Sequence, residues 1–98
     1  MIIEHLQGHC VDVMASLEPQ SINTVITSPP YWGLRHYGTE PQTWADGWVG
    51  ELGQESTPQA YVQHLLEVFD AVARVLRTDG VAWVNLGDTY ASASGPQC

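Results

Sequence analysis

The sequence predicts an α/β domain with a mainly parallel sheet and flanking helices. Three observations predict this class. Apolar, β-branched runs typical of strands begin at Ile2, Ile22 and Val81, and stretches with helical spacing of apolar residues separate them. The order strand, helix, strand, loop, helix, strand favours parallel pairing, because parallel strands need long crossover connections. The 98 residues allow one small domain, with the element order of half a doubly wound fold.

The first half of the chain contains a short strand, a short helix and a second strand. Residues 2–6 are predicted as the first strand. Residues 10–17 are predicted as a helix, since Val11, Met14 and Leu17 recur near one face. Residues 22–26 form the second predicted strand. Its β-branched residues fall on both faces, which is typical of a strand that is buried on both sides.

The second half contains a long loop, a long helix and a third strand. Residues 33–56 lack clear periodicity and are predicted as a loop. Thr57 and Pro58 are typical of a helix start, with threonine as the N-cap and proline at the first helical position. Asp79 and Gly80 are predicted to end this helix before a strand at residues 81–86, and the tail 91–98 is predicted to fray. The helix is predicted to bury an apolar stripe (Tyr61, Val62, Leu65, Leu66, Val68, Phe69, Val72, Ala73, Val75 and Leu76) and to expose a polar face (Gln63, Glu67, Asp70, Arg74 and Arg77).

Composition and charge argue against several classes of protein. The chain carries a formal net charge of −8, with no lysine and with arginine only at positions 35, 74 and 77. Such a surface is unsuited to phosphate contacts, so any part that reads nucleic acid is expected outside these residues. Two cysteines without zinc-ligand spacing predict neither a disulfide framework nor a metal site. The sequence has no signal-peptide pattern and no membrane-spanning run, so a reducing cytoplasm is the expected compartment.

Residues 27–32, with the sequence Thr-Ser-Pro-Pro-Tyr-Trp, follow directly on the second predicted strand. Ligands of open α/β sheets bind at the carboxyl ends of strands, so this position suits a functional site. Pro29 and Pro30 fix the backbone φ angle and remove two N–H donors. The segment therefore offers the Ser28 hydroxyl and free backbone carbonyls as stiffly held acceptors beside the flat ring of Tyr31. A planar group with an exocyclic NH2 fits such a surface; a proline-stiffened turn with a packed ring is the structural alternative.

Residues 26–31 resemble the catalytic motif of the DNA amino-methyltransferases, in which Asp or Ser precedes Pro-Pro and an aromatic residue. The Thr-Ser-Pro-Pro-Tyr form is most similar to the N4-cytosine branch, whereas Asp-Pro-Pro-Tyr is commoner in the N6-adenine branch. Residues 32–38 are similar to a run in bacterial and phage restriction-modification methylases, which usually have Asp at the position of His36. The resemblance implies a partial Rossmann-like methyltransferase fold, with residues 1–98 as a single partial catalytic domain.

The resemblance also implies a reaction and roles for the motif residues. The expected reaction transfers a methyl group from S-adenosylmethionine to the exocyclic N4 of cytosine in double-stranded DNA. By family position, Ser28 accepts a hydrogen bond from that amino group, the Pro29 carbonyl is the second acceptor, and Pro30 holds the turn rigid. Tyr31 is expected to stack on the target base, which must flip out of the duplex because its amino nitrogen is inaccessible in the stack.

Four further residues are candidates for contacts with substrate or cofactor. Trp32 and Arg35 follow the motif as substrate-binding candidates, and Arg35 is the one basic residue near it. His9 and Asp88 are the cofactor-binding candidates. His9 stands in Gly-His-Cys, where the family usually has Gly-Asp-Cys after its first strand, and Asp88 follows the third predicted strand. A surface ion pair for Arg35, helix capping for His9 and a turn position for Asp88 are the structural alternatives.

The remaining tryptophans and histidines are predicted to have structural roles. Trp44 and Trp48 lie in the predicted loop among acidic residues, and ordinary packing is predicted for both rather than base stacking. His5, His36 and His64 lack metal-ligand spacing and are predicted to be structural or exposed.

A Phe-x-Gly-x-Gly-like cofactor loop, which such enzymes carry after their target-recognition region, is not found in the sequence. We therefore expect the chain to correspond to the N-terminal part of a longer bacterial or phage methyltransferase and to have no turnover alone. The resemblance implies a cognate restriction endonuclease as a partner in the same system. Two alternatives remain open. One is a methylase for adenine N6 or for a non-DNA amine or amide, and the other is a non-catalytic α/β binding module, which the acidic balance and His9 favour.

Overall fold

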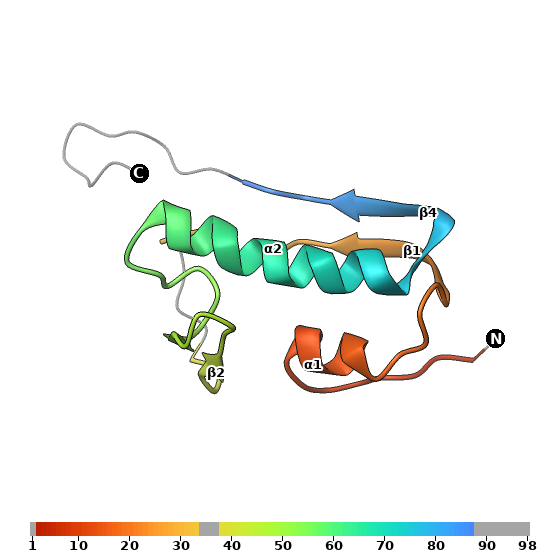
Figure 1. Ribbon diagram of the computed structural model, residues 1–98, viewed down its shortest axis with the longest axis horizontal. Helices are drawn as coiled ribbons and strands as arrows, with labels where there is room; N and C mark the ends of the chain where they lie inside the picture. The colour runs from red at the N-terminus through yellow and green to blue at the C-terminus, as the bar shows by residue number, and fades with distance from the viewer. Residues whose placement is uncertain (1, 34–37, 88–98) are drawn as a thin grey trace.

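The structure is a computed structural model, and it describes residues 2–33 and 38–87. In chain order, the elements are α1 (Cys10–Ala15), β1 (Ile22–Thr27), β2 (Gln42–Thr43), β3 (Val49–Gly50), α2 (Pro58–Val75) and β4 (Leu76–Val84). Figure 1 shows the long helix α2 running alongside β1 and β4, with the β2–β3 hairpin close to the start of α2.

Strands β1 and β4 form a two-stranded parallel sheet, as the order of elements predicts. Ile22 lies opposite Leu76, and after an irregularity in register Thr24 lies opposite Val81. The pairing continues beyond β4, because the backbone N–H of Asn85 donates a 3.0 Å hydrogen bond to the carbonyl of Thr27. Both strands therefore end at the same edge of the sheet, and the chain leaves that edge at Ser28 and again after Asn85.

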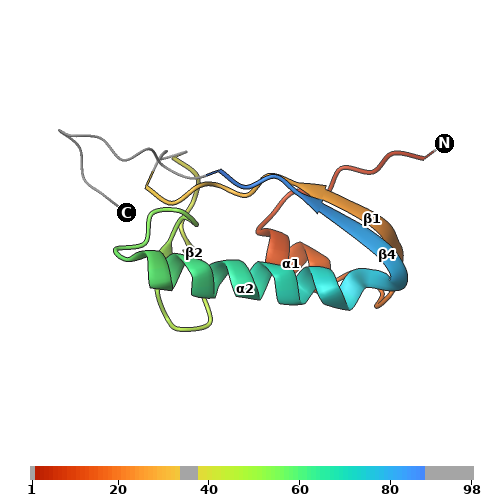
Figure 2. The same cartoon turned by 90° about the horizontal axis from the view of Figure 1, so that it is seen from above.

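Both helices cover the same face of this sheet, as Figure 2 shows. Helix α2 begins as predicted: the Thr57 side chain accepts a 3.1 Å hydrogen bond from the N–H of Ala60, and Pro58 follows in the first turn. The guanidinium of Arg74 donates a 3.0 Å hydrogen bond to the carbonyl of Met14 and so links α2 to α1. The buried apolar core is small and lies mainly along α2: it contains Trp44, Leu65, Val68, Val72 and Val75.

Two predictions about the sheet were wrong. Residues 2–6 do not form a strand, and no described segment pairs with them, so their backbone lacks the hydrogen-bonding partner that a strand needs. Burial of β1 on both faces was also wrong. Ile26 is 80% exposed and Trp83, opposite it in β4, is 65% exposed. The helices cover one face only, and no described residue covers the outer face.

Predictions about the helices were partly wrong. Helix α2 ends at Val75 rather than near Asp79, because the backbone of Leu76 turns extended and pairs with Ile22. Arg77 consequently lies in β4, where its Nε donates a 3.1 Å hydrogen bond to Asp79. The buried stripe is narrower than predicted, since Val62 and Leu66 are 51% and 57% exposed. Helix α1 stops at Ala15, two residues before the predicted end.

Within residues 2–33 and 38–87, neither helix combines the length and the hydropathy that crossing a bilayer requires.

Candidate active site

The Ser-Pro-Pro-Tyr loop (residues 28–31) leaves the carboxyl end of β1 and meets the segment that follows β4. The contact is at Gly87, where an added Cβ would lie 2.5 Å from Cε2 of Tyr31. The Tyr31 ring therefore packs against the bare backbone of Gly87. Parallel pairing of β1 and β4 explains this meeting, because it brings the two strand ends to one edge of the sheet.

A cavity of about 670 Å³ opens beside the loop. Ser28 and Pro30 line one part of it, and Gly8, His9 and Cys10 line another. The remaining wall comes from the segment between residues 39 and 52 and includes two carboxylates. The structure thus gathers predicted catalytic residues and one predicted cofactor residue, His9, around one hollow. Arg35 and Asp88 lie outside the described residues.

His9 occupies the N-cap position of α1, but its side chain does not cap the helix. Its backbone carbonyl accepts a 2.9 Å hydrogen bond from the N–H of Val13. The imidazole instead meets the indole of Trp44 edge-on, with ring centroids 4.8 Å apart and planes inclined at 77°. His9 therefore links the start of α1 to the segment that forms the far wall of the cavity.

Three hydrogen bonds hold residues 30–33, the end of the Ser-Pro-Pro-Tyr loop and the two residues after it. The hydroxyl of Tyr61 donates to the carbonyl of Pro30 at 2.6 Å. The indole N–H of Trp32 donates to the carbonyl of Glu55 at 2.8 Å, and the N–H of Gly33 donates to the carbonyl of Gly53 at 2.8 Å. The expectation of free carbonyls throughout the loop is corrected at Pro30, whose carbonyl is occupied. Trp32 is anchored by its indole N–H, while Ser28 is exposed and Pro29 is buried.

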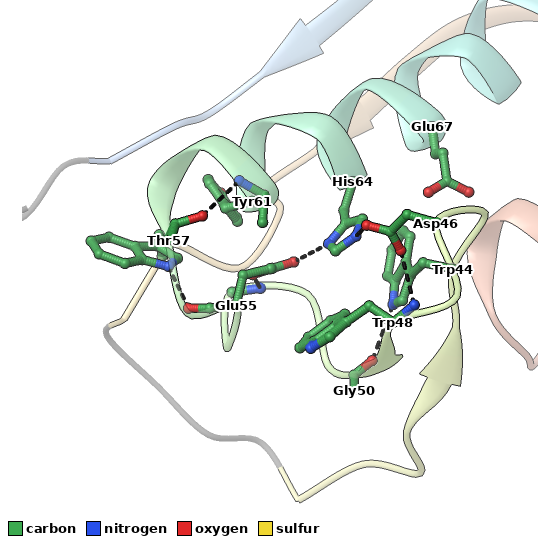
Figure 3. A network of polar contacts seen from close by, with 12 residues as sticks. Trp44, Asp46, Trp48, Gly50, Glu55, Thr57, Tyr61, His64 and Glu67 are labelled. Carbon is green, nitrogen blue, oxygen red and sulfur yellow. Dashed lines mark hydrogen bonds and ion pairs between the residues drawn. The ribbon is translucent and has the colours of Figure 1, made fainter.

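The β2–β3 hairpin packs a second group of aromatic and charged residues onto α2 (Figure 3). The backbone N–H of Trp44 donates to the carbonyl of Trp48 at 2.9 Å, and the Trp48 N–H donates to the carboxylate of Asp46 at 2.9 Å. The carboxylate of Glu67 accepts from the N–H of Ala45 at 3.2 Å. Trp44 is 4% exposed, so the predicted packing role is confirmed for this residue.

His64 lies at the centre of this second group, with 1% of its surface exposed. Its Nδ1 lies 2.7 Å from Oε2 of Glu55, and its Nε2 lies 2.8 Å from Oδ2 of Asp46. The imidazole is stacked between two indoles, with centroids 4.9 Å from Trp44 and 5.0 Å from Trp48. Glu55 is also buried, at 5% exposure, and its other carboxylate oxygen accepts a 2.8 Å hydrogen bond from the N–H of Gly53.

The electrostatics follow from this arrangement. Burial away from water opposes the charging of His64, but the hydrogen bonds that its ring donates to Glu55 and Asp46 outweigh this effect and raise the pKa of the imidazole above 6.5. The hydrogen bond from the Trp48 N–H, followed by that from His64, lowers the pKa of Asp46 below 3.8. Burial, followed by the negative charge of Glu55, raises the pKa of Tyr61 above 10.0.

This cluster was not predicted from the sequence, although a signal for it was present. His64 lies three residues after Tyr61 and four before Val68, which places it on the buried stripe of α2. A buried histidine needs partners for both ring nitrogens, and acidic residues precede the helix. No group of three or more metal-binding side chains is arranged to hold an ion within the described ranges 2–33 and 38–87.

Comparisons with known proteins show the family of the chain. The chain matches the DNA methylase family over residues 22–96. It is 46% identical over 83 residues to the Type II methyltransferase M.SfiI of Streptomyces fimbriatus. The matched residues cover 85% of this chain and 18% of that protein. It is 38% identical over 88 residues to the Type II methyltransferase M.Cfr9I of Citrobacter freundii, covering 90% of this chain and 26% of the relative.

A third relative is the Type II methyltransferase M.SmaI of Serratia marcescens, which is 36% identical over 85 residues, or 87% of this chain and 26% of that protein. The chain therefore spans between 18% and 26% of the length of these three relatives. No solved structure matches the chain. With the match over residues 22–96 and a Ser-Pro-Pro-Tyr loop at the carboxyl end of β1, the chain belongs to the DNA methylase family of amino-methyltransferases.

Proposed function

We propose that this chain supplies the catalytic loop of a DNA methyltransferase that transfers a methyl group from S-adenosylmethionine to the exocyclic N4 of cytosine. The observation that carries the proposal is the placement of Ser28 and Pro30 on one cavity with the Gly8-His9 segment. The Type II methyltransferase relatives support a restriction-modification system as the setting, inside a bacterial or phage-infected cell. A cognate restriction endonuclease is part of the same proposal.

The chemical problem is the weak nucleophilicity of the amino nitrogen, whose lone pair is delocalised into the ring of the base. Acceptors that hold both amino hydrogens favour tetrahedral geometry at nitrogen and stabilise the positive charge that develops there. We assign the Ser28 hydroxyl and the Pro29 carbonyl to this role. The Pro30 carbonyl already accepts a hydrogen bond from Tyr61, so we do not assign it to this role. A serine hydroxyl is a weak base at neutral pH, so Ser28 orients the amino group rather than removing its proton, and that proton is lost to solvent after the methyl group has been transferred.

Tyr31 is assigned as the platform for the flipped base. Its ring is half-buried and backed by Gly87, which limits its movement on one side. A ring held in this way offers a face for stacking at little entropic cost, and stacking on an aromatic residue contributes about 1–3 kcal/mol per base. The bases of intact duplex DNA stack on one another, so this contact requires flipping.

The cavity is compatible with S-adenosylmethionine as the cofactor. Its volume of about 670 Å³ lies within the range of small-molecule sites. Glu40 and Glu51 contribute carboxylates to its lining, which suits a ligand that carries ammonium and sulfonium charges. We assign Gly8 and His9 to the cofactor side of the cavity, and Asp88 as a further candidate. When bound, the cofactor supplies an electrophilic methyl group, and Ser28 lines the same hollow.

DNA contacts are assigned to parts of the longer enzyme that these residues do not contain. The chain carries a formal net charge of −8, and arginines 74 and 77 already contact Met14 and Asp79. Neutralisation of the charge on DNA phosphates depends on Lys and Arg. Arg35, beside the catalytic loop in sequence, is proposed as the one local contact to substrate, and Trp32 as a support for the loop.

The proposal is tested in a chimera in which residues of this chain replace the matching segment of M.SfiI. Transfer of labelled methyl groups to DNA is measured, and the modified nucleoside is identified by mass spectrometry. Ser28→Ala is expected to reduce transfer by about 100-fold or more, the scale of removing one preorganised hydrogen-bonding group. Ser56→Ala, which removes the hydroxyl of an exposed serine outside the cavity lining, is the matched control.

The outcomes separate the alternatives. N4-methylcytosine in the product supports the proposal, and N6-methyladenine would replace it with the adenine reaction. If the chimera methylates DNA equally well with Ser28→Ala and Ser56→Ala, Ser28 has no catalytic role and the proposal fails.

A further inference from the structure

The protonation state of His64 follows from its two partners. Both ring nitrogens face carboxylate oxygens, at 2.7 Å from Glu55 and 2.8 Å from Asp46. An ionised carboxylate only accepts hydrogen bonds, and a neutral imidazole has only one N–H. Both contacts are therefore hydrogen bonds only when the ring is an imidazolium. The stacked indoles of Trp44 and Trp48 present their π faces to the same ring, which favours the cation.

Glu55 connects this cation to the catalytic loop. One carboxylate oxygen accepts from His64, and the other accepts a 2.8 Å hydrogen bond from the N–H of Gly53. The Glu55 backbone carbonyl accepts from the indole N–H of Trp32 at 2.8 Å. A single buried residue thus links the imidazole of α2 to the residue that directly follows Tyr31.

Gly53 extends the connection along the loop. An added Cβ on Gly53 would lie 2.9 Å from the carbonyl oxygen of Tyr31 and 3.4 Å from Cβ of Pro30. Its carbonyl accepts the N–H of Gly33 at 2.8 Å. Residues 53–55 therefore form a supporting segment that packs against residues 30–33. The Glu55 carboxylate connects both ends of this supporting segment to His64.

We propose that His64, held as an imidazolium between Glu55 and Asp46, is a positioning residue that fixes the Ser-Pro-Pro-Tyr loop through Glu55. The inference rests on the proposed function only in treating that loop as catalytic; the coupling itself is a property of the folded chain. His64 is not among the residues that line the cavity, and its ring nitrogens contact Glu55 and Asp46, so it acts through another residue.

Loss of the proton changes the geometry in a defined way. A neutral ring keeps one donor, and its other nitrogen then presents a lone pair to a carboxylate oxygen less than 3 Å away. That contact must lengthen. If it is the contact to Glu55, the carboxylate turns away and the supporting segment loses the hydrogen bond from the Gly53 N–H. The titratable and charged groups around the imidazole are Asp46 on the hairpin, Glu55 before α2, Tyr61 and Glu67 on α2, and His9 across Trp44.

The test is a pH titration of the 98-residue chain followed by NMR. The imidazole nitrogens of His64 report its protonation. The indole N–H of Trp32 and the backbone N–H of Gly53 report the conformation of the supporting segment. We expect the Trp32 and Gly53 signals to shift with the same midpoint as His64, and hydrogen exchange at the Trp32 indole to accelerate above that midpoint. A histidine that only fills space would titrate without moving these two signals.

Variants sharpen the result. His64→Gln is expected to abolish the transition at Trp32 and Gly53, while His5→Gln, which removes an exposed histidine outside the cluster, is expected to preserve it. Glu55→Gln keeps an oxygen for the Gly53 N–H but presents an amide donor to the imidazole, so the midpoint of His64 should fall. The wild-type titration decides the matter even if a variant fails to fold.

Two results would overturn the inference: titration of His64 with Trp32 and Gly53 unmoved, or a ring that stays neutral through the acidic range. The titration uses neither DNA nor cofactor. If the three signals titrate together but Ser28→Ala does not reduce methylation, the proposed function fails and this inference stands. Methylation that depends on Ser28 without coupled titration would remove this inference alone.

Discussion

The hydroxyl of Tyr61, in the first turn of α2, donates a 2.6 Å hydrogen bond to the carbonyl of Pro30 in the Ser-Pro-Pro-Tyr loop. The two residues are 31 positions apart in the sequence. Neither proline of the loop can donate a backbone hydrogen bond, so the loop depends on donors from elsewhere to fix its carbonyls. Tyr61 supplies one of these donors. Its hydrogen bond therefore links the start of α2 to the candidate active site.

Tyr61→Phe is expected to lower the free energy of unfolding by about 0.5–1.5 kcal/mol, because it removes one hydrogen bond and leaves the ring in place. Urea unfolding of the chain followed by circular dichroism measures this change. Gln63→Ala, at an exposed position on the same helix, is the control and should change stability little. An unchanged midpoint for Tyr61→Phe would mean that the Pro30 carbonyl is equally well satisfied by water.

Thr57→Ala is expected to cost about 1 kcal/mol of stability, within a range of about 0.5–2 kcal/mol for helix caps. The physical reason is loss of the side-chain acceptor for the N–H of Ala60, which lies 3.1 Å from the Thr57 hydroxyl. Thr57→Ser keeps that oxygen and should retain most of the stability. Equal loss from both variants would assign the effect to packing of the threonine methyl group instead.

Gly87→Ala is expected to displace the Tyr31 ring or the chain after β4, since the added methyl group would lie 2.5 Å from Tyr31 Cε2. Overpacking of this kind costs about 1–3 kcal/mol. A double-mutant cycle with Tyr31→Ala tests the assignment. The Gly87→Ala penalty should shrink once the ring is absent, and a penalty of the same size in both backgrounds would place the clash elsewhere.

Local patterns predicted the elements that depend on local chemistry. The predicted N-cap of α2 at Thr57 was confirmed. It could be predicted because a threonine followed by proline caps a helix through contacts within one turn of the chain. The parallel pairing of β1 with β4 was confirmed because the order of elements restricts it. The boundary at Val75 was not predicted, because pairing of Leu76 with Ile22 overrides the helical periodicity that continues past it.

The candidate site divides in the same way. The Ser-Pro-Pro-Tyr loop was found from its residue types and its place after a strand. The cluster around His64 was not, because it joins Asp46, Glu55 and His64 from three separate segments whose contacts only the fold creates. Burial of β1 on its outer face was wrong because composition shows that a strand is apolar without showing that anything covers it; Ile26 is 80% exposed.

The same cluster makes stability depend on pH, and the sign follows from the direction of each shift. The pKa of His64 is raised above 6.5, so its contribution is fully present below 6.5 and is lost as the pH rises through the folded-state pKa. The pKa of Asp46 is lowered below 3.8, so its contribution is present above 3.8 and is lost as the pH falls through the folded-state pKa. Tyr61, with a pKa raised above 10.0, contributes only a later loss at high pH.

Stability is therefore expected to be highest between the ordinary pKa values of 3.8 for Asp46 and 6.5 for His64. Urea unfolding at pH values on both sides of 6.5 measures the alkaline decline for the wild type and for His64→Gln. The variant should be less stable at low pH and should lose the decline near neutrality, because glutamine carries no proton to release. His5→Gln should follow the wild-type curve. If the stability of His64→Gln still declined with rising pH, the pH dependence would belong to another group. The proton that couples Glu55 to folding would then not be the one on the His64 imidazole.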